Sequence, residues 1–393
     1  MPKIHIPVIG YTQGGRQMMT TAMSAVDLVS MVTKPKAWDP ATTSEHGNRA
    51  RDTPHMLGIV NYLETVPKYV IGCAVVYLTS KEASFEPTTV PNVTTENDAA
   101  QFGVLSIDIG ARFDIGDGQH RIGAYEKIVQ SRDEDDPLIQ NLRSAGQPLI
   151  IVIEDDPKSR AQDFADLQRN VKPPTASLGQ SMDRRQPINN ELSDLFTTVP
   201  LLVDRVEYSK DNPGKLSAKL FSFKTIRYVS GLLLVGNGYR SPATMDKAVN
   251  ACFEGEANAE KARKTLKDFW TTLGELVRFA DVIDEDVPVP ELREATYLTS
   301  AGVLYAIAYA VHQTIQTYDI TTPGAVRALD DVSFDRAPKD GNGDLVLPVT
   351  AEHTIFAGTL INAQNGKLEA GRTAWEGAGM VLYKHIKETL ATD

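Results

Sequence analysis

The chain is poor in cysteine, and this scarcity excludes two classes of protein. Only Cys73 and Cys252 occur among its 393 residues, and they form no CxxC motif or Cys/His cluster. We therefore expect neither a disulfide scaffold nor a structural zinc site, and a reduced cytoplasm fits this composition best. Long apolar runs are also missing, since polar residues flank even the stretch 303–311 within a turn or two. We predict no signal peptide and no membrane-spanning helix.

Positive charge is the minority sign, with 40 Lys and Arg against 51 Asp and Glu and a formal net charge of −11. This balance argues against nucleic acid as a partner, because a DNA duplex is itself a dense polyanion. The hydrophobic share of 42% beside 23% charged residues is typical of a globular protein. At roughly 100 to 200 residues per domain, the length indicates two domains, or one large domain with an appendage.

Hydrophobic patterning before residue 158 alternates between strand and helix signals. Strands are predicted at 4–9, 16–22, 69–78, 104–109, 112–115 and 147–154. Helices are predicted after the capping residues Ser24 and Thr53, and again at 119–129. We expect a hairpin between the strands 104–109 and 112–115. The strand 112–115, the helix 119–129 and the strand 147–154 together predict a βαβ-like unit.

From about residue 159 the pattern changes to long helical stretches with few strand signals. These stretches lie at 161–169, 192–202, 223–234, 257–282, 291–316 and 373–390. We therefore predict an α+β chain, in which a mixed α/β domain (1–158) precedes a mainly α-helical domain (159–393). Acidic or glycine-rich linkers interrupt the second domain at 284–286 and 330–344.

The most informative stretch is FDIGDGQHRIGAYEKI, residues 113–128. A buried strand is predicted to end at Gly116, and the residues Asp117 to Arg121 then open a helix. The first amides of a helix lack internal partners and the helix dipole adds partial positive charge, so this turn can bind an anion. His120 and Arg121 would add side-chain donors, and the planar fork of arginine matches phosphate oxygens. The turn is therefore a candidate phosphate-binding loop.

A blander alternative exists for the same residues. Asp117 would only cap the helix, His120 would be a surface residue, and Arg121 would pair with Asp114. No G-x-x-x-x-G-K-[ST] sequence occurs, so a nucleotide site at this loop would not be a P-loop. Asp163 and Asp166 share a helical face and could hold a divalent ion, although amphipathic helices commonly show such pairs.

The segment Asp117-Gly118-Gln119-His120-Arg121, read with Ile122-Gly123-Ala124, resembles the signature of the DGQHR-domain family, and most closely its DndB-like members of DNA sulfur modification. The loop is also similar to the arginine-bearing phosphate loop of the ParB and sulfiredoxin superfamily. A second block, from Phe164 through Asn170, Lys172 and Ser177 to Arg185, resembles the family's FxDLN, KP, SL and Asp-Arg segments. Gln168 departs from that pattern, which usually has Asn there. Sulfiredoxin chemistry is not expected, because no cysteine lies in or beside the loop.

The resemblance implies a bacterial or archaeal protein of the DNA phosphorothioation system, with a ParB/sulfiredoxin-like N-terminal domain. It implies a DNA-binding transcriptional regulator whose DGQHR loop binds ATP or another NTP, with Mg²⁺ accompanying the nucleotide. No metal site made by the protein's own residues is predicted. Candidate nucleotide-binding residues are Arg51, Gly118, Gln119, Arg121, Asp166, Asn170 and Lys172.

Two other functions stay open. In the first, the protein is a nucleotide-hydrolysing or DNA-nicking enzyme of the same system, with DNA as effector or substrate. Its catalytic residues would be Asp117, Gln119, His120 and Arg121, with His120 positioning a phosphate oxygen and Arg121 stabilising charge. In the second, it is a scaffold for other proteins of the modification system. The oligomeric state stays open too, with a homodimer as one option.

Charge is unevenly distributed, which reopens the question of DNA. Six basic residues face three acidic ones in 158–185, and six face two in 205–227. Local rather than total charge decides phosphate contacts within a Debye length, so 158–227 is the candidate face for double-stranded DNA, either promoter or phosphorothioate-modified. These cations could equally decorate solvated helices, and the helix 223–234 could enter a groove or belong to the core. Candidate DNA-contacting residues are Lys158, Arg160, Arg169, Arg184, Arg185, Lys215, Lys219, Lys224 and Arg227.

Overall fold

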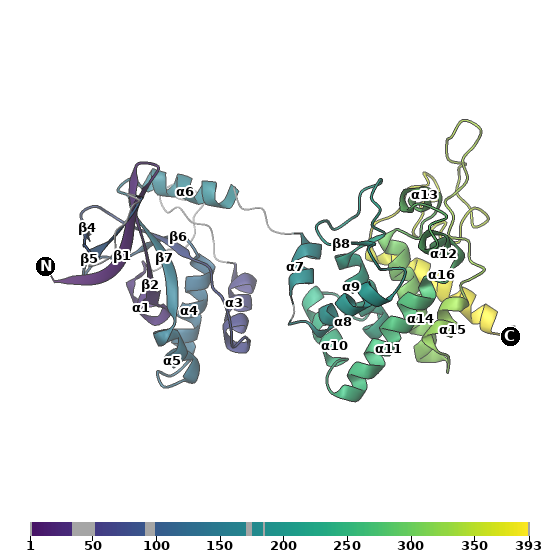
Figure 1. Cartoon of the computed structure of the whole chain (residues 1–393), viewed down its shortest axis with the longest axis horizontal. Helices are drawn as coiled ribbons and strands as arrows, with labels where there is room; N and C mark the ends of the chain where they lie inside the picture. Colours follow the sequence, from purple (N-terminus) through teal and green to yellow (C-terminus); the bar gives the residue numbers. More distant parts are fainter. Residues whose placement is uncertain (1, 34–51, 91–98, 170–174, 184, 392–393) are drawn as a thin grey trace. The chain divides into compact units, whose positions relative to one another are not determined.

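The computed structural model describes the chain except for residues 1, 34–51, 91–98, 170–174, 184 and 392–393 (Figure 1). Its internal contacts divide the chain into two compact units, Met1–Lys172 (unit 1) and Pro173–Asp393 (unit 2). Unit 1 contains a seven-stranded mixed sheet with helices, and unit 2 is built mainly of helices. The division falls after helix α6 (Pro157–Arg169), whereas the sequence pattern puts the domain boundary before it.

The sheet of unit 1 has the strand order β4-β5-β1-β2-β7-β3-β6. Strands β3 and β7 pair in parallel, and the other neighbours are antiparallel. The strands are β1 (Lys3–Gln13), β2 (Arg16–Ser24), β3 (Ala74–Leu78), β4 (Ala83–Pro87), β5 (Ala100–Asp108), β6 (Asp114–Asp117) and β7 (Gly146–Ile153).

Helices cover the two faces of this sheet unequally. On one face, α1 (Ala25–Met31) and α4 (Gln119–Ser131) bury Leu28 and Ile122 against the strands. A second apolar layer joins these two helices to α3 (Thr53–Thr65) and α5 (Pro137–Ser144). On the other face, α6 packs near Tyr77. The core of unit 1 therefore lies mainly between the sheet and the helices α1 and α4. The DGQHR residues begin the second of these helices.

Several local expectations for unit 1 are confirmed. The strands 4–9, 16–22 and 147–154 appear as β1, β2 and β7, and the helix 119–129 appears as α4. Ser24 caps α1, because its side chain accepts a hydrogen bond from the amide of Asp27. The cap of α3 is instead Asp52, whose carboxylate accepts from the amide of His55. Thr53 is thus the first residue of that helix and not its cap.

Three expectations about the strands of unit 1 are wrong. The strand expected at 69–78 begins only at Ala74. Strands β5 and β6 form no hairpin, because β5 pairs with β1 and β4 while β6 pairs with β3. The backbone of Phe113 instead bonds to Met31 and Thr33 at the end of α1. These bonds direct the chain away from β5 before β6 begins. Strands β6 and β7 lie on opposite sides of β3 and run antiparallel to each other, so β6-α4-β7 is no parallel βαβ unit.

Unit 2 is built around two buried helices, α9 (Phe223–Val235) and α14 (Ala301–Thr317). These helices contact each other and pack on several neighbours. A short parallel pair, β8 (Val206–Glu207) with β9 (Phe221–Ser222), precedes α9. No helix in the described part of the chain is long and apolar enough to cross a membrane. The helices are α7 (Ala176–Met182), α8 (Pro187–Thr198), α9 (Phe223–Val235), α10 (Pro242–Ala251), α11 (Glu256–Leu273), α12 (Val277–Ile283), α13 (Val289–Ala295), α14 (Ala301–Thr317), α15 (Thr322–Arg327) and α16 (Arg372–Leu390).

Two predicted long helices of unit 2 are each broken into a pair. The stretch 257–282 divides into α11 and α12 at Gly274, which caps the end of α11. The stretch 291–316 divides into α13 and α14 after Thr296, a buried residue with extended backbone. The hydroxyl of Thr296 accepts a hydrogen bond from the amide of Leu298. Apolar periodicity continues through both breaks, because both members of each pair line the same core.

Candidate functional site

The DGQHR segment lies at the turn from the edge strand β6 into helix α4. Gly118 is the residue before the helix, and its φ of +94° lies in the left-handed region that favours glycine. A Cβ at Gly118 would lie 2.9 Å from the Cβ of Ala74 on the neighbouring strand β3. As the N-cap residue of α4, Gly118 has no side chain that could cap the helix. The first amides of this helix therefore start at a glycine that brings backbone close to the sheet, as an anion site requires.

Arg121 rests against the backbone at this turn. Its Nη2 donates to the carboxylate of Asp117, the last residue of β6, at 2.6 Å. A Cβ on Gly72 would lie 2.8 Å from Nη1 of Arg121, so the guanidinium also lies against the segment leading into β3. The bland alternative is thereby corrected at two points, because Asp117 is not a cap and Arg121 does not pair with Asp114. The guanidinium is held at the start of α4, and the side chain of Arg121 is 22% exposed.

His120 is buried, with 8% exposure, and is not a surface residue. Its Nε2 accepts a hydrogen bond from the backbone amide of Asp52 at 2.9 Å, so this ring nitrogen carries no proton. The ring of His55 packs edge-on against it at a centroid distance of 4.8 Å. The start of α3 is thus joined to the start of α4. Arg51, a predicted phosphate contact, lies outside the described residues, but its neighbour Asp52 contacts the DGQHR segment.

Cys73 lies beside the loop in space, although it is far from it in sequence. The charges of Arg121 and Asp117 both act on its thiol, and the first lowers the thiol pKa while the second raises it. Burial is the largest influence and raises the pKa above its ordinary value. The expectation that no cysteine neighbours the loop is therefore wrong. The raised pKa keeps the thiol protonated near neutral pH, so Cys73 is not an activated nucleophile.

A buried polar network, missed by the sequence analysis, holds the segment next to Arg121. The hydroxyl of Tyr125 on α4 donates to the amide oxygen of Gln147 at 2.7 Å. The amide nitrogen of Gln147 donates to the carbonyl of Gly72 at 3.0 Å. Because buried polar groups must be paired, this network fixes Gly72 against α4 and β7. In the sequence, this network is indicated only by Gln147, a polar residue at the start of an apolar strand.

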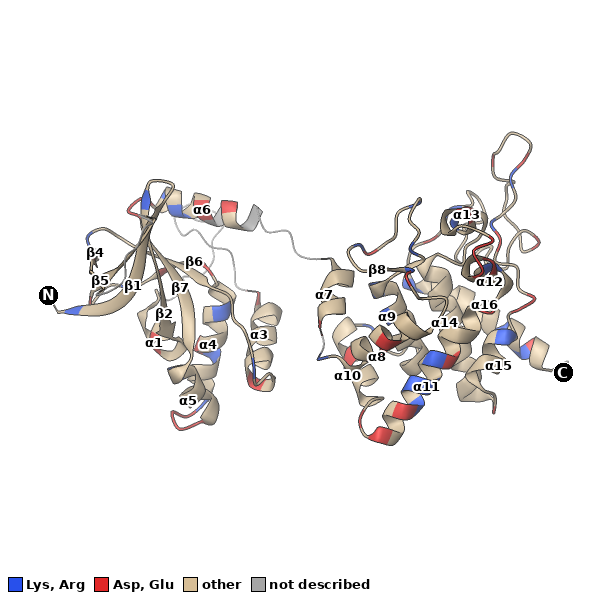
Figure 2. Cartoon of the chain, in the orientation of Figure 1, with Lys and Arg blue, Asp and Glu red and all other residues tan. Residues whose placement is uncertain are grey.

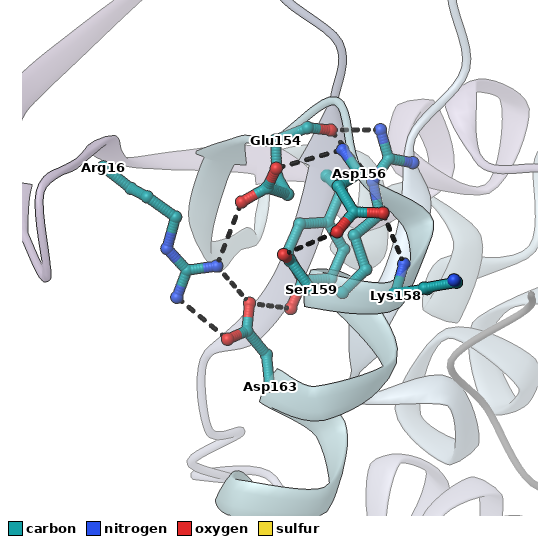
Figure 3. Close-up of polar contacts among 8 residues, drawn as sticks. Arg16, Glu154, Asp156, Lys158, Ser159 and Asp163 are labelled. Carbon is teal, nitrogen blue, oxygen red and sulfur yellow. Dashed lines mark hydrogen bonds and ion pairs between the residues drawn. The ribbon is translucent and has the colours of Figure 1, made fainter. Parts of the chain in front are cut away.

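A second polar cluster anchors α6 on the opposite face of the sheet (Figure 3). The guanidinium of Arg16 donates to both carboxylate oxygens of Asp163, at 2.5 and 2.8 Å, and reaches Glu154 as well. The hydroxyl of Tyr77 donates to Asp163 at 3.0 Å, and burial, followed by the charge of Asp163, raises the pKa of Tyr77. Asp163 is therefore a structural anchor.

Asp163 is one of the two carboxylates on this helix that could hold a divalent ion, and both of its oxygens already accept hydrogen bonds from Arg16. Asp166 is exposed and accepts a hydrogen bond from Gln162 at 2.9 Å. In the part of the chain that the structure describes, no three His, Cys, Asp or Glu side chains gather as metal ligands would. Asn170 and Lys172, the other predicted nucleotide contacts after α6, lie outside the described residues.

The predicted DNA-contacting residues separate into occupied and exposed cations. Arg160 is 13% exposed, pairs with Asp114 at 2.6 Å and lies over the ring of Tyr77. Arg227 is 12% exposed and binds Asp246 and Asn189, at 2.9 and 2.8 Å. Both hold elements of their own units together. Lys219 is half-buried and donates to a backbone carbonyl, and Arg184 and the side chain of Arg169 lie outside the described part. The exposed cations are Lys158, Arg185, Lys215 and Lys224. Two of them form ion pairs at the surface, Lys224 with Asp211 at 3.3 Å and Arg185 with Asp183 at 2.9 Å.

Helix α9 is a core helix, which decides between the two readings of 223–234. Ile226 and Val229 are fully buried, and Phe223 packs on Phe196. It therefore has no free face with which to enter a groove. Along α11 the charged residues are grouped by sign, because two glutamates come first, four basic residues follow and Asp268 comes last (Figure 2).

Replacing Gly118 with alanine tests the close approach of the loop to β3. Gly118→Ala adds a Cβ in left-handed backbone and against Ala74, so the free energy of unfolding should fall by about 1–3 kcal/mol. Gly110→Ala is the matched control, because a Cβ there meets no atom within 4 Å. Urea unfolding of both variants measures the difference. Equal stability of the two would contradict the described turn.

Two aspartates one turn apart on α6 test the anchor cluster. Asp163→Asn removes the charge that Arg16 and Tyr77 share, and should lower the free energy of unfolding by about 1–3 kcal/mol. Asp166→Asn changes an exposed residue and should stay within about 0.5 kcal/mol of the wild type. Thermal unfolding of the full chain is the measurement. A larger loss at position 166 than at 163 would refute this arrangement.

Comparison with known proteins identifies the family of the chain. No curated protein and no solved structure matches it. The family model DndB, described as DNA-sulfur modification-associated, matches residues 6–366. This match includes the DGQHR loop, the polar cluster of α6 and unit 2 as far as residue 366, before helix α16. The chain therefore belongs to the DndB family of DNA-sulfur modification-associated proteins.

Proposed function

We propose that this protein is a DNA-binding transcriptional regulator of a DNA phosphorothioation system, and that its DGQHR loop binds a nucleotide phosphate. The family match supports the link to sulfur modification. The observation that carries the phosphate site is the glycine start of α4, where Gly118 brings backbone close and Arg121 lies beside it. An anion there would meet helix amides, a helix dipole and a guanidinium together.

In this proposal, unit 1 is a ParB/sulfiredoxin-like phosphate-binding domain. Its support is an arginine-bearing loop at a strand-to-helix turn, together with the buried residues Gln119 and His120 that open the helix. ATP or another NTP, with Mg²⁺ bound to its phosphates, is the proposed ligand. Asp117 would have to exchange its pairing with Arg121 for the contact between Arg121 and phosphate, which a more highly charged anion can drive.

Binding, and not hydrolysis, is the function that the geometry favours. A catalytic Asp117 would have to leave its ion pair with Arg121. A catalytic His120 would have to release the amide of Asp52, which its Nε2 already binds. Both groups are thus used to assemble the loop. Phosphate binding exchanges the same ion pair of Arg121 but leaves the contact between His120 and Asp52 in place.

The proposed DNA contacts are the exposed cations of the 158–227 region. Lys215 and Lys224 lie in unit 2 within a segment whose basic residues exceed its acidic ones, and Arg185 follows α7. Each lysine that neutralises a DNA phosphate releases condensed counterions, so binding should weaken steeply with salt. Arg160 and Arg227 are removed from the proposed contacts, because their paired side chains are only 13% and 12% exposed. Lys224 and Arg185 also pair with carboxylates, but their side chains stay exposed and can exchange these partners for phosphate.

The salt dependence of DNA binding tests the regulator proposal. Fluorescence anisotropy of a duplex from upstream of the modification genes should give a negative slope of log K against log salt. Lys215→Gln or Lys224→Gln should each reduce that slope by about 0.9. Lys264→Gln on α11 is the control, since this exposed lysine lies outside the proposed segment and pairs with Asp268 as Lys224 pairs with Asp211. A flat salt response, or an equal effect of Lys264→Gln, would reject the proposal.

The two cysteines report on the nucleotide site. Because Cys73 neighbours Arg121 and Asp117, ATP with Mg²⁺ at the loop should slow alkylation of Cys73 several-fold and leave Cys252 in unit 2 unchanged. Arg121→Gln should abolish the protection, whereas Arg132→Gln at the other end of α4 should preserve it. Mass spectrometry of labelled peptides measures both rates. Equal protection of the two cysteines would indicate general stabilisation instead of a local site.

A further inference from the structure

The loop between β8 and β9 exposes a leucine among cations. Leu216 lies in a turn and is 88% exposed, more than any other large hydrophobic side chain in the described part of the chain. Lys215 precedes it and is also exposed, and Lys219 follows three residues later. One exposed leucine is ordinary on a protein surface and indicates nothing alone. Its meaning depends on how the loop is held and on the charges around it.

An arginine of another helix fixes the backbone on both sides of Leu216. Arg293 on α13 donates from Nη1 to the carbonyls of Lys215 and Ser217, at 2.9 and 3.0 Å. Its Nη2 donates to the carbonyl of Lys219 at 2.6 Å. Three carbonyls of a five-residue stretch therefore converge on one guanidinium. A loop held in this way presents its side chain in a defined position, so less ordering is needed when a partner binds.

A second arginine supports the helix that holds the loop. Arg336 donates from Nε and Nη2 to the backbone carbonyl of Arg293, so its guanidinium lies against α13. Among the described residues, neither arginine forms an ion pair with a carboxylate, whereas Arg160 and Arg227 both do. Glu291 and Glu294 share α13 with Arg293, but residues one or two positions apart on a helix do not face each other.

We propose that this loop enters a groove of duplex DNA and that Leu216 inserts between two base pairs. The inference rests on the proposed function, and it adds the mode in which DNA is bound. Lys215 and Arg336 contact phosphates, while the apolar side chain of Leu216 replaces part of the stacking that it disrupts. Arg293 is a positioning residue, because it acts through the loop backbone.

Duplex DNA fits this surface better than a membrane or an apolar protein does. The loop combines one apolar side chain with several cations, which is the arrangement of groove-binding wedges. Stable attachment to a lipid surface would require more apolar area than a single leucine supplies. Flexible pyrimidine–purine steps are where such a wedge unstacks DNA most easily.

Fluorescence of 2-aminopurine tests base-pair insertion with the full chain. The probe is a duplex from upstream of the modification genes, carrying 2-aminopurine at each TA or CA step in turn. Unstacking by the wild type should raise the fluorescence several-fold at one step. Leu216→Ala should remove this rise and weaken binding about tenfold. Leu216→Met should retain most of the rise, and the matched control Leu368→Ala, at another exposed leucine of unit 2, should behave as the wild type.

Arg293→Lys separates positioning from charge. It keeps the positive charge but cannot bind three carbonyls at once, so the 2-aminopurine signal should be lost while the salt slope of binding stays unchanged. Circular dichroism melting confirms that each variant is folded. An unchanged signal in Arg293→Lys would remove the positioning role.

The possible outcomes separate this inference from the proposed function. Salt-dependent binding of the wild type without a fluorescence rise at any step would overturn the wedge and leave DNA binding in place. A rise that survives in Leu216→Ala, or that Leu368→Ala removes equally, would overturn it as well. Absence of salt-dependent binding by the wild type would reject the wedge and the DNA-binding function together.

Discussion

The close approach of Gly118 to Ala74 is the constraint on which the candidate site depends. A side chain at position 118 would push the start of α4 away from β3, and left-handed backbone would strain any other residue there. Because that approach is made, Arg121 can lie against Gly72 and pair with Asp117. A helix terminus, a guanidinium and the segment before β3 then meet at one point of unit 1.

Buried hydrogen bonds maintain this arrangement from several directions. His120 binds the backbone before α3, and Tyr125 reaches Gly72 through Gln147. Each of these contacts joins segments that are far apart in sequence, and each satisfies groups that would be costly to bury unpaired. The residues that make the loop look catalytic are therefore partly the residues that assemble it. This double use favours the proposed binding of an anion over proton transfer by the same residues.

Charge at the level of the whole chain is a poor guide to its partners. The net charge of −11 and the local basic excess of 205–227 both describe the same protein, but neither tells which cations are available. Arg160 and Arg227 belong to basic segments and pair with carboxylates, whereas Arg293 and Arg336 lie outside those segments and, among the described residues, bind carbonyls and an aromatic ring. The cations near the loop of Leu216 thus come from separate parts of the sequence.

The sequence by itself determined the features that depend on neighbouring residues. Alternation predicted β1, β2 and β7, the DGQHR turn predicted the start of α4, and two motif blocks indicated the family. Only the tertiary structure decided the pairing of β5 and β6, the breaks that create α12 and α14, and the place of Cys73 beside the loop. These features depend on contacts between distant segments, and apolar periodicity is the same whether a helix continues or breaks within one core. For the same reason, no local pattern could show that Arg293 holds the loop that exposes Leu216.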